Sequence, residues 1–472
     1  MKMSNRAVLD GVRGLLSQHA YEYARNNRIH MAMLPWTRKY AAGRFTVLNE
    51  KATPGGRYER HIQIAQDSQV PFLPLVLDTF AQSMKIENYF SGGSYEQSPL
   101  WEHWQRNAMD AAQTGITRAA LKYGTSYAVV DRGTFPGQAS APLITGVSPR
   151  MMTAYYGESR AWPGEYGLTS EWPILALEIR GARMRLIDEN YIYYIGARHA
   201  PKNPAEWVSE TWNNALNLQI IEARPHGAGV PPVVRFRDRW LLDGEEHGGI
   251  IEPLLSLQDR IDRTSYEMGI AQYYAAFKQR YVIGWAPKDE LDGIRMKAND
   301  VWFINADGTK TKVGQFEETD LTRYIDSKQA TIRDLAAIAQ VPAQSLGANA
   351  ISNISADGLA AMESAKDRKA SEIQTSLGES YEQLLRLCGH MDGDADSAAD
   401  FAGEVKWKDT TARSFAQTVD ALGKLATMLG IPAEALLEDI PGFTEEKIQR
   451  ILTKYGYPST QGDETQTMPE VT

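Results

Sequence analysis

The chain has 472 residues and a formal net charge of −9, with 43% hydrophobic and 23% charged residues. This length exceeds a single ordinary core, so we expect a folded protein with two to four subdomains. A net negative chain is not suited to gripping nucleic acid by neutralising phosphates. The single cysteine, Cys388, excludes an intrachain disulfide and any multi-cysteine metal site, and we expect a buried thiol on a helix.

The hydrophobic pattern predicts no membrane span. The longest apolar runs, such as Pro71–Leu77, have about seven residues, whereas a spanning helix needs about 18 or more. Residues 1–6 lack the apolar core of a secretory signal, so we expect synthesis in the cytosol.

The first third of the chain is predicted to be mainly helical. Residues 1–40 suggest one or two helices with a break at Pro35, and Phe72–Phe90 suggests an apolar helix interrupted at Pro74. A tryptophan-rich helix should follow Pro99. One face of that helix is expected to contain Trp101, Trp104, Ala108, Ala111 and Ala112.

Short strands are predicted from Gly124 to Phe236. They are expected at Tyr127–Val130, Leu143–Val147, Ile174–Ile179, Met184–Ile187, Tyr191–Ile195 and Trp207–Thr211. This pattern favours an antiparallel meander packed on the preceding helices, which is an α+β domain.

The central stretch, residues 249–355, alternates between helical and strand periods. Apolar residues spaced by three and four predict a helix of about 28 residues, roughly 42 Å long, with Pro253 in its first turn. Strands are then predicted at Tyr281–Ile283, Val301–Ile304 and Lys310–Phe316, before a second helix that stops at Val341-Pro342. The polar loop that follows has too few large apolar groups to pack a core.

The last quarter is predicted to be helical with polar breaks. A long helix is expected over Ser355–His390, an acidic loop over Met391–Asp400, and helices over Ala412–Leu429 and Glu445–Lys454. Residues 459–472 are polar and are expected to be disordered.

No motif predicts catalysis, a cofactor site or a strong metal site. Asp392, Asp394, Asp396 and Asp400 resemble the first ligands of a calcium loop, and weak divalent-ion binding is left open. However, Ser397 and Gly403 stand where that loop needs glycine and a bidentate glutamate, which favours a solvated acidic turn.

Two further patterns have ordinary structural interpretations. Gly124–Ala128 resembles a nucleophile elbow, but it lacks the final glycine and comes between a helix and a strand rather than after a strand. Alternating basic residues, which we interpret as solvated strand edges, are Arg183 with Arg185 and Lys310 with Lys312.

Several segments, in this order and spacing, resemble the siphovirus portal proteins of tailed bacteriophages, in particular those of phages that infect actinobacteria. These segments are Leu100–Asn107, Leu121–Tyr127, Ile250–Leu254 with Gln258–Ile261, Phe277–Arg280 and Ile354–Leu359. The resemblance implies an α+β portal fold assembled as a ring of about twelve copies, with a formal charge on the order of −108, twelve times −9. A channel wall with this negative charge repels the DNA phosphates and cannot hold a duplex in one register.

The resemblance also implies a division of the chain into functional parts. These are a wing (1–248, N-terminal helices and antiparallel meander), a first stem helix (249–278), a clip containing β structure (279–316), a second stem helix (317–341), a tunnel loop (342–354), a long helix and loop connecting wing and crown (355–400), a helical crown (401–458) and a disordered tail (459–472).

As the resemblance implies, the ring would be a virion protein made in the host cytoplasm, with no enzyme activity and no cofactor. Double-stranded DNA would pass through it without sequence recognition, and short polar groups suit such transient contacts. The expected DNA-facing residues are Gln344, Ser345, Asn349, Ser352 and Asn353. The expected docking residues of the clip, for the terminase large subunit and later the head–tail adaptor, are Arg280, Lys288, Lys310 and Lys312. Major capsid and scaffolding proteins are further expected partners.

Two alternatives make different demands on the structure. A nucleic-acid-processing packaging enzyme would need carboxylates clustered for two metals on strands of one sheet. A membrane-peripheral scaffold would need a basic amphipathic helix. The ring itself requires that the two central helices are not fully buried within one copy.

Overall fold

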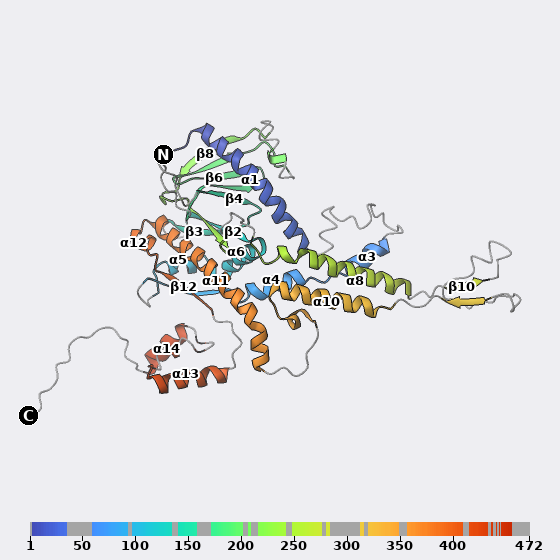
Figure 1. Ribbon diagram of the computed structural model, residues 1–472. Coiled ribbons are helices and arrows are strands. Elements are labelled where there is room, and N and C mark those ends of the chain that lie inside the picture. The colour runs from blue at the N-terminus through green and yellow to red at the C-terminus, as the bar shows by residue number, and fades with distance from the viewer. Residues whose placement is uncertain are drawn as a thin grey trace, which may run out of the picture. The chain divides into compact units, whose positions relative to one another are not determined.

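The computed structural model forms two compact units, Met1–Trp407 and Lys408–Thr472. The residues that it describes are 2–34, 59–92, 97–134, 140–157, 171–201, 206–208, 216–241, 248–275, 280–283, 312–315, 320–348, 356–408, 415–432, 436–437, 440, 443 and 445–455. Within these ranges, no helix is both long enough and apolar enough to cross a membrane. Figure 1 shows the chain as a ribbon.

The first unit begins with a long helix that covers an antiparallel sheet (Figure 1). Helix α1 (Asn5–Ala32) starts at Ser4, whose Oγ accepts a hydrogen bond from the Ala7 N–H at 3.3 Å. The five-stranded sheet has the order β4-β5-β6-β7-β8. Its strands are β4 (Met152–Tyr156), β5 (Pro173–Arg180), β6 (Arg183–Ile187), β7 (Tyr191–Gly196) and β8 (Gln219–Pro225). The apolar face of α1 packs on this sheet and forms one of the hydrophobic clusters.

A second antiparallel sheet joins this region to the helices. It has the order β3-β2-β9, made of β3 (Ser140–Val147), β2 (Thr125–Thr134) and β9 (Val233–Arg237). The predicted antiparallel β region is therefore confirmed, although it is divided between two sheets, and β4, β8 and β9 were not predicted. The predicted strand Trp207–Thr211 is wrong at its start, because residues 206–208 form a helical turn that buries Trp207.

The helices between Phe72 and Tyr123 are shorter than predicted. Helix α4 (Phe72–Ala81) contains Pro74 in its first turn without interruption, since the first N–H groups of a helix need no internal partner. The predicted continuation is wrong: β1 (Ile86–Phe90) pairs with β12 (Glu404–Trp407), another strand that was not predicted. A strand forms there because its backbone gains partners far along the chain.

The tryptophan-rich helix is also divided. Ala108 has a φ of 51° and separates α5 (Trp101–Arg106) from α6 (Met109–Tyr123). Trp101 and Trp104 are buried, but Ala108, Ala111 and Ala112 are exposed, so the predicted common face is wrong. The left-handed residue rotates the second helix relative to the first.

The main core surrounds the longest helix, α11 (Ala356–Asp392). Tyr381 at its centre is fully buried, and its hydroxyl lies 2.9 Å from Thr117 Oγ1. Cys388 is also fully buried, as predicted, and burial raises the pKa of its thiol. The helix therefore links β9, α6 and the β1–β12 pair.

Arg185 does not lie on a solvated strand edge, contrary to the prediction. Strand β6 is the middle strand of its sheet. Arg185 is ion-paired with Glu178 at 2.5 Å and with Asp131 at 2.8 Å, and Glu178 is buried. The alternating basic pattern here reflects an ion-pair network between the two sheets.

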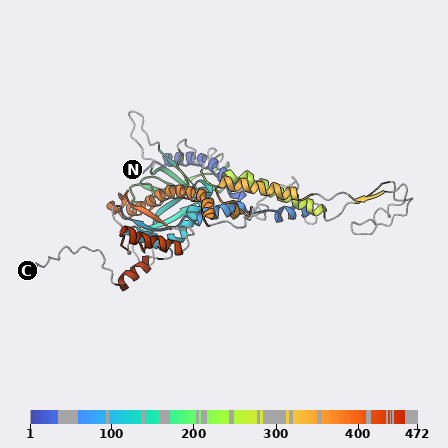
Figure 2. The same cartoon turned by 60° about the horizontal axis from the view of Figure 1, so that its bottom comes forward.

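The central stretch forms two neighbouring helices, as predicted (Figures 1 and 2). Two strands near predicted positions pair antiparallel with each other, a pairing that was not predicted, and we call this pair the hairpin. The elements are η1 (Glu252–Leu254), α8 (Leu255–Ala275), β10 (Arg280–Ile283), β11 (Lys312–Gln315), α10 (Thr322–Ala339) and η2 (Ala343–Leu346). Helix α3 (Glu59–Asp67) packs on α8, where a Cβ at Gly269 would lie 2.9 Å from Ile64 Cγ2. The predicted strand Val301–Ile304 lies outside the described residues.

The second unit contains α13 (Phe415–Leu429) and α14 (Glu445–Tyr455), close to the predicted ranges. The acidic loop before it is partly helical, since α11 continues to Asp392 and α12 spans Ala395–Ala398. Residues 459–472, predicted to be disordered, lie outside the described residues.

Candidate functional site

The α8–α10 pair is buried at one end, which we call the stem base. The buried residues of the pair in the main core are Leu254, Ile261, Ile332, Leu335, Ala336 and Ala339. On the second helix these positions are spaced by three and four residues, so one stripe of α10 faces the core. Lys369 of α11 donates to the Ala339 carbonyl at 3.2 Å and joins the end of α10 to the long helix.

Polar contacts also fix the stem base to α1 and α6. Arg25 is ion-paired with Glu252 at 2.6 Å and donates to the carbonyls of Tyr123 at 2.9 Å and Gly248 at 3.0 Å. The backbone of Gly124, at the end of α6, passes so close to Gly248 that a side chain would not fit between them. A Cβ at Gly124, whose φ is +85°, would lie 2.5 Å from the Gly248 carbonyl carbon. Both contacts hold the start of the stem rigidly against the core.

Asp238, which follows β9, also contacts the start of the stem base. Its Oδ2 accepts from the Gly249 N–H at 2.7 Å and from the Arg239 guanidinium at 3.2 Å. The carboxyl is fully buried, and this burial raises its pKa despite the neighbouring arginine.

The other end of the pair, which we call the distal stem, has no buried side chain among the described residues 266–273 and 320–330. Ile325 is 48% exposed. Asp326 is exposed in this segment, and Arg333 and Asp334 are exposed on the part of α10 beside the stem base. None of the three forms an ion pair within the part of the chain that the structure describes. The distal stem therefore carries exposed apolar and charged groups, although α3 packs on α8 at Gly269.

Two of the predicted docking residues of the clip, Arg280 and Lys312, lie on the β10–β11 pair. In the β10–β11 pair, Arg280 is opposite Gln315 and Lys312 is opposite Ile283, so the two basic residues lie at opposite ends of the ladder. Lys312 is exposed. Lys288 and Lys310 lie outside the described residues.

The tunnel-loop segment is more closely packed than predicted. Leu346 and Ala348 are buried in the main core, so the expectation of a loop that cannot pack is wrong for residues 342–348. Ser345 is exposed and Gln344 is half-buried on η2. Asn349, Ser352 and Asn353 lie outside the described residues, so the structure describes only two of the five expected DNA-facing residues.

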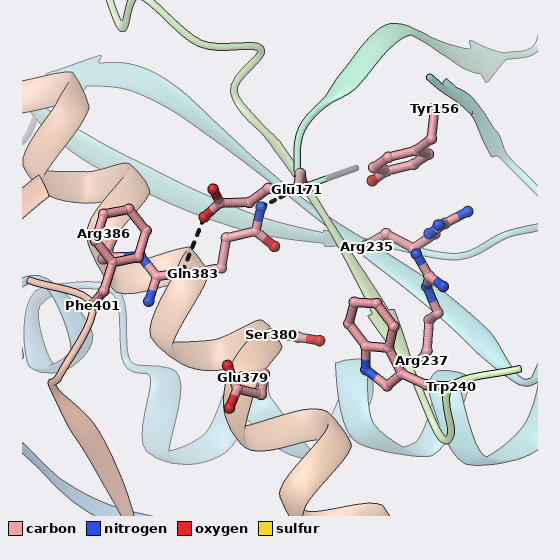
Figure 3. Close-up of a pocket in the computed structure, with 10 residues that line it drawn as sticks. All are labelled: Tyr156, Glu171, Arg235, Arg237, Trp240, Glu379, Ser380, Gln383, Arg386 and Phe401. Carbon is pink, nitrogen blue, oxygen red and sulfur yellow. Dashed lines mark hydrogen bonds and ion pairs between the residues drawn. The ribbon is translucent and has the colours of Figure 1, made fainter. Parts of the chain in front are cut away.

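A cleft of about 270 Å³ lies between α11 and the end of β9 (Figure 3). Three arginines around it each face an aromatic ring: Arg235 at 3.8 Å from the Tyr156 ring centre, Arg237 at 4.6 Å from Trp240, and Arg386 at 4.8 Å from Phe401. Arg386 also pairs with Glu171 at 3.1 Å, and Gln383 donates to the Glu171 carbonyl at 2.7 Å.

The lining of the cleft also includes one hydroxyl on α11, Ser380 Oγ, which donates to the Ser376 carbonyl at 3.2 Å. Sequence reasoning did not identify this site. The sequence feature that indicates it is the alternation of arginine and an apolar residue on β9. Arg235 and Arg237 flank the buried Phe236 and therefore share the opposite face of the strand.

The motifs weighed as catalytic or metal-binding have structural partners. Ser126 Oγ is buried and donates to the Ile116 carbonyl at 2.9 Å. Asp394 accepts from the Ser397 N–H at 3.2 Å as the N-cap of α12, and Asp400 accepts from the Gly92 N–H at 3.0 Å. No group of three or more potential metal ligands converges within the described ranges.

Comparison with known proteins gives consistent matches over most of the chain. A family model for "Phage portal protein, SPP1 Gp6-like" matches residues 68–455. The portal protein of Mycobacterium phage D29 is 24% identical over 371 residues, covering 76% of this chain and 72% of the relative. The portal protein of Mycobacterium phage L5 is 22% identical over 375 residues, with the same two coverages.

Two solved structures of a gene transfer agent (GTA) contain chains with a partial likeness. A chain in the virion of a native particle has 13% identity and a TM-score of 0.47, covering 84% of this chain and 98% of its own length. A chain in the neck of a native particle, computed with C12 symmetry, has 13% identity and a TM-score of 0.45, with coverages of 85% and 93%. Since the family model spans well over half of its residues, this chain belongs to the SPP1 Gp6-like family of phage portal proteins.

Proposed function

We propose that this chain is the subunit of a ring, of about twelve copies, that forms the DNA channel at one vertex of a phage head. Double-stranded DNA enters through the ring during packaging and leaves through it at ejection. The family supports this function, and the observation that carries the assembly is the distal stem, whose described residues include no buried side chain. A heterologous contact repeated around a closed ring gives every copy the same neighbours.

The exposed charges of the stem suit contact between copies. Helix α8 exposes Asp259, Arg260, Arg263 and Glu267 on one face. Helix α10 exposes Arg323, Asp326, Arg333 and Asp334. Because both faces carry both signs, the α8 face of one subunit and the α10 face of the next can pair charges. Ile325 lies on the other side of α10, in line with Ile332, and would be covered by a different part of a neighbouring subunit.

The segment after α10 would supply the contacts to DNA. Ser345 and Gln344, with Asn349, Ser352 and Asn353, offer short uncharged groups, and such groups contact phosphate without reading sequence. The packed residues Leu346 and Ala348 would fix one end of this segment to the core.

The hairpin would dock the packaging motor and later the head–tail connector. Residues 279–316 contain six basic and five acidic residues, a net charge of +1 on a chain that is acidic as a whole, and Arg280, Lys288, Lys310 and Lys312 are the proposed docking cations. The terminase large subunit would supply ATP hydrolysis, so the portal itself acts without catalysis. Capsid and scaffolding proteins would contact the outer parts of the ring, and the assembled protein is part of the virion.

The assembly is tested by imaging the wild type and an Ile325→Asp variant with negative stain and native mass spectrometry. We expect rings with a central channel for the wild type, and folded single subunits for the variant, because a buried unpaired charge opposes closure. Ile221→Asp is the matched control, since Ile221 is 69% exposed but lies on β8 outside the stem. Intact rings of Ile325→Asp would contradict this interface.

The DNA contacts are tested in a phage whose only portal gene carries alanine at Asn349, Ser352 and Asn353. We expect normal rings and normal heads, but impaired packaging or retention of DNA, measured as the DNA content of purified heads. Failure of the rings to assemble would show that this segment is structural.

A further inference from the structure

Basic side chains from three elements converge at the junction of α1, α6 and the turn before β4. Lys122 Nζ of α6 lies 3.2 Å from His30 Nδ1 of α1, and the Tyr123 hydroxyl lies 3.3 Å from the same nitrogen. Arg150 from the turn is the third basic residue. All three of His30, Lys122 and Arg150 are half-buried, and we call them the cationic cluster.

Arg150 is held by neutral groups alone. Its Nη2 donates to Asn27 Oδ1 at 3.1 Å, and its guanidinium lies 5.5 Å from the centre of the Tyr23 ring. Its Nε is buried and has no hydrogen-bond partner. A buried donor without a partner is costly, so this atom points to a missing acceptor.

No carboxylate of the described residues pairs with Lys122 or Arg150. Glu252, bound to the neighbouring part of α1, is shared by Arg25 and Arg28. The cluster thus places the cations of Lys122 and Arg150 beside the His30 ring without a counter-charge in the part of the chain that the structure describes.

The electrostatics agree with this geometry. Burial, then Arg150 and Lys122, lower the pKa of His30 to about 4, and burial followed by Arg150 lowers the pKa of Lys122 to about 8. Both shifts would be reversed by a bound anion, since an opposite charge favours the protonated form.

We propose that the cationic cluster, with the Tyr123 hydroxyl, binds a tetrahedral oxyanion of the phosphate class. A guanidinium, an ammonium and a hydroxyl from three positions suit an anion that has several acceptor oxygens around one centre. The anion is either free phosphate or a phosphodiester of the DNA backbone, and both offer the same oxygens to this site. The inference is independent of the ring, because every residue it uses belongs to one copy.

The test follows the His30 ring signals by NMR in the full chain with labelled histidine, during titration with inorganic phosphate at constant ionic strength. We expect saturable binding, and a rise of the His30 pKa from about 4 toward its ordinary value. Lys122→Met and Arg150→Met should each weaken phosphate binding at least tenfold. Lys85→Met, which removes the same charge from an exposed lysine, should leave it unchanged.

Thermal melting checks that each variant is folded, and only folded variants are compared. Competition with a short DNA duplex then distinguishes the sources: displacement of phosphate assigns the site to backbone phosphodiesters, and no displacement assigns it to free phosphate. A His30 pKa that does not respond to phosphate overturns the proposal. It is also overturned if the two variants bind phosphate normally but associate less with other copies, since the cluster then pairs with a carboxylate of a second copy.

Discussion

The two ends of the α8–α10 pair have similar local sequence patterns but different surroundings. At the stem base, Ile261 and Leu335 are fully buried, and polar contacts from Arg25 and Asp238 close the joint. At the distal stem, the described residues include no buried side chain. One copy of the chain therefore buries the base, whereas the exposed side chains of the distal stem would be covered by other copies in the proposed ring.

The largest contrast is expected between two apolar residues of the same helix. Leu335→Ala should lower the free energy of unfolding by about 2–5 kcal/mol, because it leaves a cavity in the main core. Ile325→Ala, at a position that is 48% exposed, should lower it by less than about 1 kcal/mol. Urea denaturation of unassembled subunits measures both values. Equal losses would mean that the distal stem is also stabilised within one copy.

A smaller contrast is expected between two ion pairs. Arg25→Met removes hydrogen bonds to Glu252 and to two carbonyls, and should cost about 1–3 kcal/mol of unfolding free energy. Arg323→Met removes an exposed pair with Asp320 at 3.6 Å, and should cost between zero and about 1 kcal/mol. The same denaturation experiment measures both. If Arg323→Met costs as much as Arg25→Met, the distal charges already contribute within the single copy.

The smallest effect is expected in the pH dependence of the stem base. Because burial raises the pKa of Asp238 in the folded chain, the unfolded chain releases this proton at lower pH, so the contribution of Asp238 to stability falls as pH rises above about 4. Asp238→Asn should remove this fall, which is read from the difference between variant and wild-type unfolding free energies across pH. Asp326→Asn removes the same charge from the exposed distal stem and is the control. A difference that does not change with pH would contradict the assignment.

Much of the fold was predictable because the pattern of apolar residues is local. The periods of three and four predicted α8, α10 and α11, and Pro253 correctly indicated the first turn of the stem. The strand pattern also predicted β5, β6 and β7, each of which buries side chains in a core.

The errors occur where distant partners override local preference. Ile86–Phe90 continues an apolar run yet forms a strand, because β12 lies beside it some 300 residues later in the chain. Ala108 has good helix propensity but adopts a left-handed conformation between α5 and α6. Leu346 is a single large apolar residue in a polar segment, and only the shape of the neighbouring core shows that it is buried.

The candidate sites also differ in whether the sequence indicated them. The sequence and its resemblance to portal proteins indicated the stem, the hairpin and the polar segment after α10. The arginine–aromatic cleft of Figure 3 and the cationic cluster were not indicated, because each joins segments that are far apart in the sequence, such as His30 and Lys122, which are 92 positions apart.

The sequence by itself determined the family and the order of the long helices and of strands β2, β3, β5, β6 and β7, since these depend on local spacing and on the succession of segments. Only the tertiary structure decided which end of the stem is buried and which basic groups converge without a counter-charge. Burial and charge balance depend on distances between elements, and a chain acquires those distances only when it folds.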